Sequence, residues 1–147
     1  MRSLWRARDR QALHARVARL SAAAPPRWGR MTAPQMVSHL VESLRMATGE
    51  LPVAPKRGPL RYPVVKHLIV YLIPFPKGVP TAPELVSRVP SDWPSDVRAL
   101  SAAMEGCASR AATDRWPDHP AFGRLSHRAW GVLIYRHMDH HLRQFGV

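Results

Sequence analysis

Proline-rich connections divide this chain into segments whose apolar residues recur at helical spacing. The chain has 147 residues, and 15 of them are prolines. Proline lacks a backbone N–H and disrupts a helix interior, so stretches such as APPRWG and PFPKGVPTAP are expected to be connections. No alternating apolar and polar pattern between them is long enough to build a sheet. The sequence therefore predicts an all-α protein.

Local signals place the boundaries of the expected helices. Thr32 is a good N-cap with Pro34 in the first turn behind it, and Gly49 stops that segment. Ser126 is a second plausible N-cap. The chain length fits one domain, residues 1–147. Helices are expected over residues 3–23, 32–48, 63–73, 95–112 and 126–145.

The formal charge of +12 raises the question of an anionic partner. The arginines are scattered from Arg2 to Arg143 and form no single stripe that would follow a phosphate backbone. We therefore do not expect a specific nucleic-acid partner. A basic binder of nucleic acid or an anionic surface remains an alternative, and it would use the arginines of the first helix, Arg2, Arg6, Arg8, Arg10, Arg16 and Arg19.

The single cysteine and the apolar segments bear on the compartment. Cys107 cannot form an intrachain disulfide, so a reducing cytoplasm is expected. No stretch reaches the roughly 20 apolar residues that span a bilayer. The basic N-terminus has no apolar run followed by a small-residue cleavage site, as a secretory signal would. We expect a cytoplasmic protein with no membrane span, and an Arg-rich transit peptide is the less favoured alternative.

Two histidines of the last predicted helix lie where apolar core residues belong. The inward stripe of this helix is spaced by four, three, four and three residues, and it consists of Trp130, Ile134, His137, His141 and Gln144. His137 and His141 are one turn apart, so both rings can converge on one ion. The neighbouring His140 points to another face and is a reserve ligand. The spacing makes HMDHH a candidate metal-binding motif.

His39 is the best candidate for a third ligand, because it borders the apolar stripe of the second helix. The alternative for each histidine is an ordinary hydrogen-bonded core residue. We interpret His119 as a hydrogen-bonding residue that holds its loop. The stripe of the fourth helix, Val97, Leu100, Met104, Cys107 and Ala111, makes Cys107 a small core residue rather than a reactive thiol.

These motifs carry a family resemblance over nearly the whole chain. QMVSHL together with HMDHHLRQ resembles the DinB/YfiT-like superfamily of metalloenzymes. The longer blocks RWGRMTAPQMVSHLVESL, PFPKGVPT and HPAFGRLSHRAWGVLIYRHMDHHLRQFG are more similar to a DinB-like branch known as a domain of unknown function. The resemblance implies a DinB-like four-helix bundle with one or more additional short helices.

The resemblance also implies a site and an assembly. Residue by residue, it assigns His39, His137 and His141 as ligands of a divalent metal such as zinc or nickel, in a protein that is often a homodimer. Some members of the superfamily use low-molecular-weight thiols. Three histidines leave an open position for water or substrate. Glu42 is then a candidate general base or oxygen ligand, and Gln144 a candidate holder of a ligand ring or a substrate group.

The leading expectation is a metal-dependent enzyme acting on a small molecule, either a hydrolase or a thiol-dependent transferase. The alternative is a non-catalytic dimeric helical binding module. Because His141 lies near the negative end of its helix, we expect that end to favour imidazolium in the absence of metal. Metal affinity is accordingly expected to fall steeply between pH 7 and pH 5.

Overall fold

The computed structural model describes residues 1–110 and 114–147. Within these ranges the structure is helical and contains no strand, which confirms the all-α prediction. The longer helices are α1 (Ala7–Val17), α2 (Ala33–Thr48), α4 (Trp93–Ser109) and α5 (His127–Gln144). The shorter helical segments are η1 (Pro59–Arg61), α3 (Pro63–His67), η2 (Leu68–Leu72) and η3 (Pro83–Val86).

Helix α2 begins and ends where local chemistry predicts. The Thr32 hydroxyl accepts a hydrogen bond from the backbone N–H of Gln35, whose side chain accepts one from the backbone N–H of Thr32. This capping box satisfies two N–H groups that a helix start leaves without partners. Gly49 adopts a left-handed conformation with φ 86°, which a residue with a side chain rarely adopts.

The first helix is shorter than predicted at both ends, because α1 spans Ala7–Val17 rather than residues 3–23. Leu4 is fully buried, and its backbone N–H donates to the carbonyl of Gly131 on α5 at 3.0 Å. A Cβ added at Gly131 would collide with the side chains of Ser3 and Trp5. A long-range contact with α5 therefore keeps the N-terminal residues out of the helix.

The remaining helices agree with the predictions to within about two residues at each end, except that α4 already ends at Ser109. α4 starts at Trp93 instead of Ser95, because the Asp92 side chain accepts from the Ser95 N–H and caps the helix there. The expected end of this helix at Ala112, and the core position Ala111, lie outside the described residues. After α3 the helix widens into the π-helical segment η2.

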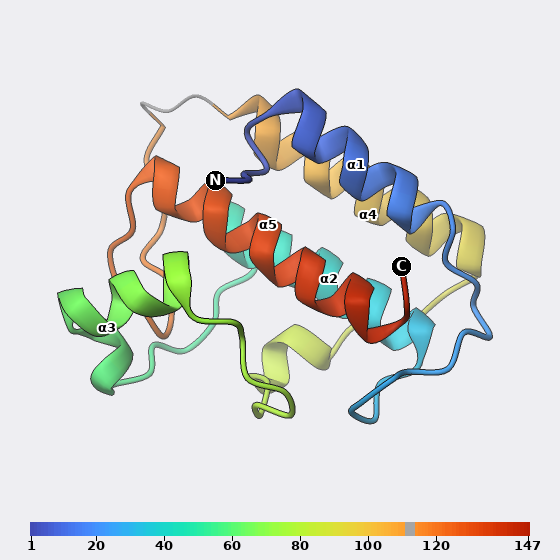
Figure 1. Cartoon of the computed structure of the whole chain (residues 1–147), viewed down its shortest axis with the longest axis horizontal. Helices are drawn as coiled ribbons and strands as arrows, with labels where there is room; N and C mark the ends of the chain where they lie inside the picture. The colour runs from blue at the N-terminus through green and yellow to red at the C-terminus, as the bar shows by residue number, and fades with distance from the viewer. Residues whose placement is uncertain (111–113) are drawn as a thin grey trace.

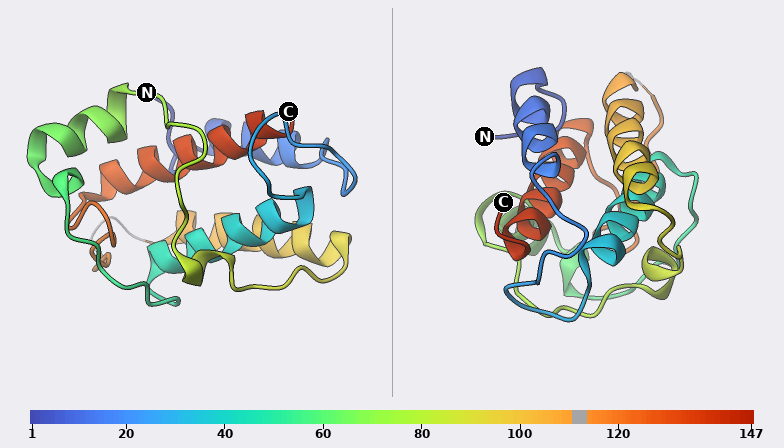
Figure 2. Two further views of the ribbon diagram at one scale, coloured as in Figure 1. Left: turned by 90° about the horizontal axis from the view of Figure 1, so that it is seen from below. Right: turned by 90° about the vertical axis from the view of Figure 1, so that its right-hand side faces the viewer.

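The four long helices pack side by side around one hydrophobic core. α1 contacts α4 and α5, and α2 also contacts α4 and α5, so the four helices form a closed, four-sided arrangement (Figures 1 and 2). η3 packs against α2, and η2 packs against α5. Fully buried side chains come from all four helices, including Leu13, Leu40, Leu100, Met104, Trp130 and Leu142. The facing of α2 and α5 matters most for the site.

Among the described residues, none of the helices is both long and apolar enough to cross a membrane.

Candidate metal centre

Three histidines from two helices meet between α2 and α5. His39 comes from α2, whereas His137 and His141 lie one turn apart on α5. One ring nitrogen of each lies within 4.8 Å of the others, and the Nε2 atoms of His39 and His137 are 3.2 Å apart. The ring centroids of each pair are 4.8 to 5.1 Å apart. The structure thus brings together the three predicted ligand residues.

A hydrogen bond to η3 sets the orientation of the His39 ring. His39 Nδ1 lies 3.1 Å from the carbonyl oxygen of Leu85. A carbonyl oxygen can only accept, so Nδ1 of His39 carries the proton and donates. In the neutral ring, Nε2 then holds a lone pair, and this is the atom that faces His137. A backbone carbonyl in η3 therefore prepares His39 as a ligand.

Gln144 prepares His141 in the same way. Its amide Nε2 donates to the carbonyl oxygen of Trp28 at 2.7 Å, so its Oε1 faces the opposite direction. That oxygen lies 2.9 Å from His141 Nδ1 and accepts its proton. The lone pair of His141 is consequently on Nε2. In many metal sites, a hydrogen bond to the ring nitrogen that does not bind the metal fixes the orientation and tautomer of the histidine.

The loop before α2 leaves room for Gln144 only because it contains a glycine. Gly29 follows Trp28 and has a φ of 78°, in the left-handed region. A Cβ at this position would lie 2.7 Å from Gln144 Nε2, which is too close for any non-bonded contact of that kind. Gly29 therefore permits both the turn and the close approach of the glutamine.

The electrostatics of the cluster favour neutral rings. Burial, followed by repulsion from His141, His39 and other histidines, lowers the pKa of His137 well below its usual value. Burial, followed by repulsion from His39, lowers the pKa of His141 to about 3. Burial also lowers the pKa of His39, although the hydrogen bond to Leu85 opposes this. At neutral pH the imidazoles carry the lone pairs that a metal requires.

These shifts correct the expectation from the helix end. The negative end of α5 was expected to favour imidazolium at His141, but burial outweighs that field, so the direction was wrong. The predicted steep fall of metal affinity between pH 7 and pH 5 stays a prediction. A metal affinity that stays flat across that interval would count against histidine ligation.

The donor set fits a divalent metal ion. Three neutral imidazoles are a common ligand set for zinc and also suit nickel. Two nitrogens bound to one tetrahedral ion at about 2.0 Å lie about 3.3 Å apart, close to the spacing of the His39 and His137 Nε2 atoms. The described residues contribute no carboxylate to this cluster. The three histidines are close enough to hold a metal ion.

Glu42 is not part of the histidine cluster. It lies one turn after His39 but forms an ion pair with Arg45 at 3.0 Å, and only 3% of its surface is exposed. The sequence did not predict this burial, which is a finding of the structure. The structure does not place it as an oxygen ligand, and its role as a general base stays a prediction.

Two aromatic side chains that the sequence analysis did not assign to the site lie next to the histidines. The Phe75 ring is 6.4 Å from that of His137 and 6.1 Å from that of His140. The Trp28 ring is 5.6 Å from that of His140, and the Lys77 ammonium lies 4.4 Å from the Trp28 ring centroid. His140, the reserve ligand, is outside the cluster. In the sequence, Trp28, Phe75 and Lys77 were noted only as parts of the blocks that carry the family resemblance.

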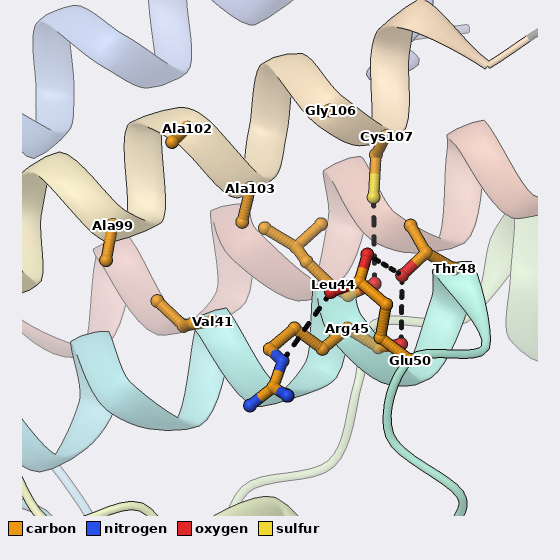
Figure 3. Close-up of a pocket in the computed structure, with 10 residues that line it drawn as sticks. All are labelled: Val41, Leu44, Arg45, Thr48, Glu50, Ala99, Ala102, Ala103, Gly106 and Cys107. Atoms are coloured by element: carbon orange, nitrogen blue, oxygen red, sulfur yellow. Dashed lines mark hydrogen bonds and ion pairs between the residues drawn. The ribbon is translucent and has the colours of Figure 1, made fainter.

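His119 and Cys107 have the structural roles expected from the sequence. His119 Nδ1 accepts from the backbone N–H groups of Ala121 and Phe122 and so holds its loop. Cys107 is fully buried, and its thiol donates to the carbonyl of Leu44 (Figure 3). Burial, with a smaller contribution from Glu50, raises the pKa of this thiol to about 12, so it is not reactive at neutral pH.

Two surface cavities differ in their relation to the histidines. The larger, about 280 Å³, lies between α2 and α4, and its lining includes Ala99, Ala103 and Gly106 but no histidine (Figure 3). The smaller, about 250 Å³, is lined by Arg30, Met31, Gln35, Val86 and Arg88. Gln35 lies one turn before His39, and Val86 follows the residue that holds the His39 ring. Chain neighbours of Gln35 and Val86 therefore belong to the cluster or hold its His39 ring, but none of the three histidines lines this cavity.

The fold and the cluster define an all-helical protein with three histidines gathered between two facing helices. The chain belongs to the family described as Protein of unknown function (DUF1569), whose sequence profile matches residues 2–146. No curated protein matches the chain, and no solved structure does.

Proposed function

We propose that this protein is a metal-dependent enzyme with the DinB-like four-helix bundle fold, which acts on a small molecule as a hydrolase or thiol-dependent transferase. Zinc or nickel would be held by His39, His137 and His141. The observation that carries the proposal is the convergence of three ring nitrogens within 4.8 Å, with the lone pairs of two of them set by hydrogen bonds behind the rings.

The closed packing of α1, α2, α4 and α5 supports the proposed bundle. Two further parts of the proposal rest on the resemblance alone, namely a homodimer and a low-molecular-weight thiol as cosubstrate, whereas the proposed cytoplasmic location rests on the single cysteine and the lack of a secretory signal. A single domain over residues 1–147 agrees with the extent of the family match. Each of these can be tested separately from metal binding.

The chemistry follows from a three-nitrogen ligand set. A divalent ion with an open position acts as a Lewis acid and lowers the pKa of a water or thiol beside it. His39 and His141 keep their Nδ1 protons on Leu85 and Gln144, so their rings stay oriented during turnover. Glu42 is our candidate for a general base. Its carboxylate would leave the ion pair with Arg45 and accept a proton from the attacking water or thiol. Gln144 acts through His141.

The cavity lined by Gln35 and Val86 is our candidate for the substrate pocket. Its volume of about 250 Å³ lies just below the range of ordinary ligand pockets, which favours a small molecule over a polymer. Its two arginines, Arg30 and Arg88, favour an anionic group on that molecule, although Arg88 also contacts Asp96 at 3.3 Å. The Phe75 ring lies near the His137 ring, and the Trp28 ring lies near that of His140.

The deciding experiment is elemental analysis of untagged protein purified without chelators. We expect about one zinc or nickel per chain, because the ligand set is complete in one chain. His39→Ala and the double variant His137→Ala, His141→Ala should lose the metal while circular dichroism shows that they remain helical.

His140→Ala provides the matched control, since His140 is adjacent to a proposed ligand on the same helix but is outside the cluster. It should retain the metal. No metal in the wild-type protein after addition of zinc or nickel would overturn the proposal, as would retention of the metal by the ligand variants. In that case a non-catalytic binding module becomes the better explanation.

A further inference from the structure

One face of the α3–η2 segment exposes apolar side chains. Val64, Leu68 and Leu72 recur every fourth residue, so they share a face, and their exposed fractions are 72%, 37% and 61%. Tyr62 and Ile73, at the two ends of the segment, are 68% and 43% exposed. Large apolar side chains gathered on one exposed face indicate an interaction surface rather than chance exposure.

The opposite side of the segment is fastened to the rest of the molecule. Arg136 of α5 donates to the carbonyl oxygens of Ile69, Val70 and Ile73, which a helix end leaves without partners. The Lys66 ammonium donates to the carbonyl of Arg124 at 2.9 Å. Val70 is buried against the core. The apolar face is therefore presented by an anchored element, which lies at one end of the molecule beside α5 (Figure 1).

The chain segment that carries this face, with its flanking residues, contains basic residues but no carboxylate side chain. Residues 51–83 contain no aspartate or glutamate, but they contain five basic residues, namely Lys56, Arg57, Arg61, Lys66 and Lys77. All of these except Lys66 are exposed. Glu84 interacts with Lys56 and offsets part of this charge, but the whole chain carries a formal charge of +12.

Exposed apolar side chains beside basic residues fit an anionic lipid surface better than a second copy of this chain. In a twofold-symmetric dimer formed through this face, each basic segment would oppose its own copy, and like charges would repel. A surface of anionic lipids instead attracts the basic residues and accepts the apolar side chains between its headgroups. Tyr62, apolar with a polar hydroxyl, is of the type enriched at that boundary.

We propose that the α3–η2 face, defined by Tyr62, Val64, Leu68, Leu72 and Ile73, docks on membranes that contain anionic lipids. Binding is peripheral: the apolar side chains enter the headgroup region while the helix lies along the surface. The inference goes beyond the proposed function and does not depend on metal binding.

The test is flotation of the purified full-length protein with vesicles. We expect binding to vesicles of phosphatidylcholine with phosphatidylglycerol to exceed binding to phosphatidylcholine alone by about tenfold, and to weaken as salt rises. The double variant Val64→Glu, Leu72→Glu should reduce binding to the anionic vesicles by at least about tenfold, because it places two carboxylates on the apolar face.

The matched control is Val79→Glu, Val89→Glu. Val79 and Val89 are 58% and 81% exposed and lie outside the α3–η2 face, and this variant changes the net charge by the same amount. It should retain binding within about threefold. An equal loss of vesicle binding in both variants would show that binding depends on net charge alone, and it would overturn the proposal. Absence of vesicle binding would also overturn it. Size-exclusion chromatography with light scattering tests the remaining occupant, a second copy of the chain. A dimer that only the Val64→Glu, Leu72→Glu variant dissociates would assign the face to that second copy and overturn the proposal.

Discussion

Gln144 is the residue that links the loop before α2 to the histidine cluster. It donates to Trp28 and accepts from His141, so its amide cannot turn without breaking one of these bonds. The spacing of the inward residues placed Gln144 on the inward face of α5, but the sequence did not show that the Trp28 carbonyl orients its amide. Its position makes it a sensitive probe of the site.

Replacement of Gln144 by leucine should weaken zinc binding by about 10- to 100-fold, because the His141 ring loses the acceptor that holds its tautomer. Competition with a chromophoric chelator measures the affinity. Gln144→Glu should recover part of the loss, since a carboxylate also accepts from His141 Nδ1. An unchanged affinity in the leucine variant would show that the hydrogen bond has no role in metal binding.

Gly29→Ala should destabilise the protein and weaken metal binding together. The variant combines a strained backbone with a clash against Gln144, and urea denaturation should show a loss of about 2 to 4 kcal/mol. Gly78→Ala is the control: its φ of 73° is similar, but nothing lies within 4 Å of the added Cβ. It should lose only about 1 kcal/mol and keep full metal affinity. Equal effects at both glycines would exclude the clash.

At the scale of elements, Arg136 joins α5 to the segment that carries the exposed apolar face. Burial lowers the pKa of its guanidinium, with an opposing contribution from Asp139, but the group stays charged at neutral pH because an arginine pKa is so high. Its contacts with three carbonyls replace the missing partners at the end of η2. The same helix therefore positions two of the histidines and the α3–η2 segment.

Arg136→Met should loosen α3 and η2 selectively. Three carbonyls lose a charged donor, so amide hydrogen exchange in residues 63–73 should become at least tenfold faster, while α2 and α4 change little. Mass spectrometry of peptic fragments measures the exchange. Arg143→Met is a suitable control, because Arg143 is largely exposed and forms its ion pair with Asp139 in the same helix. Uniform acceleration along the chain would contradict a local role.

At the scale of the whole molecule, buried neutral histidines couple folding to pH. Burial lowers the pKa of His119 to about 4, as burial and repulsion lower that of His141 to about 3, whereas an unfolded histidine titrates near 6.5. Below pH 6.5 the unfolded state therefore binds more protons than the folded state. Stability is complete above pH 6.5 and declines as the pH falls toward the folded values.

The metal-free protein should accordingly lose about 2 kcal/mol of unfolding free energy per such histidine between pH 7 and pH 5. Urea denaturation in the presence of a chelator at the two pH values measures the loss. His119→Asn keeps an acceptor for the Ala121 and Phe122 N–H groups but does not titrate, so it should reduce the pH dependence. A constant unfolding free energy from pH 7 to pH 5 would contradict neutral burial.

Local patterns in the sequence determined much of this protein. The capping residues Thr32 and Ser126 and the stop at Gly49 predicted α2 and α5 closely, because those signals act within one turn of the backbone. The one-turn spacing of His137 and His141 likewise follows from helix geometry. Such features need only neighbours in the chain, so they can be read without a fold.

Only the tertiary structure decided the rest, because it depends on contacts between distant segments. The packing of α2 on α5 brings His39 to the histidine pair, and the carbonyls of Leu85 and Trp28 orient the site from loops far away in sequence. Docking on Gly131 shortens α1, and burial reverses the expected pKa shift of His141. Folding thus set the donor geometry and its electrostatics, which no local pattern contains.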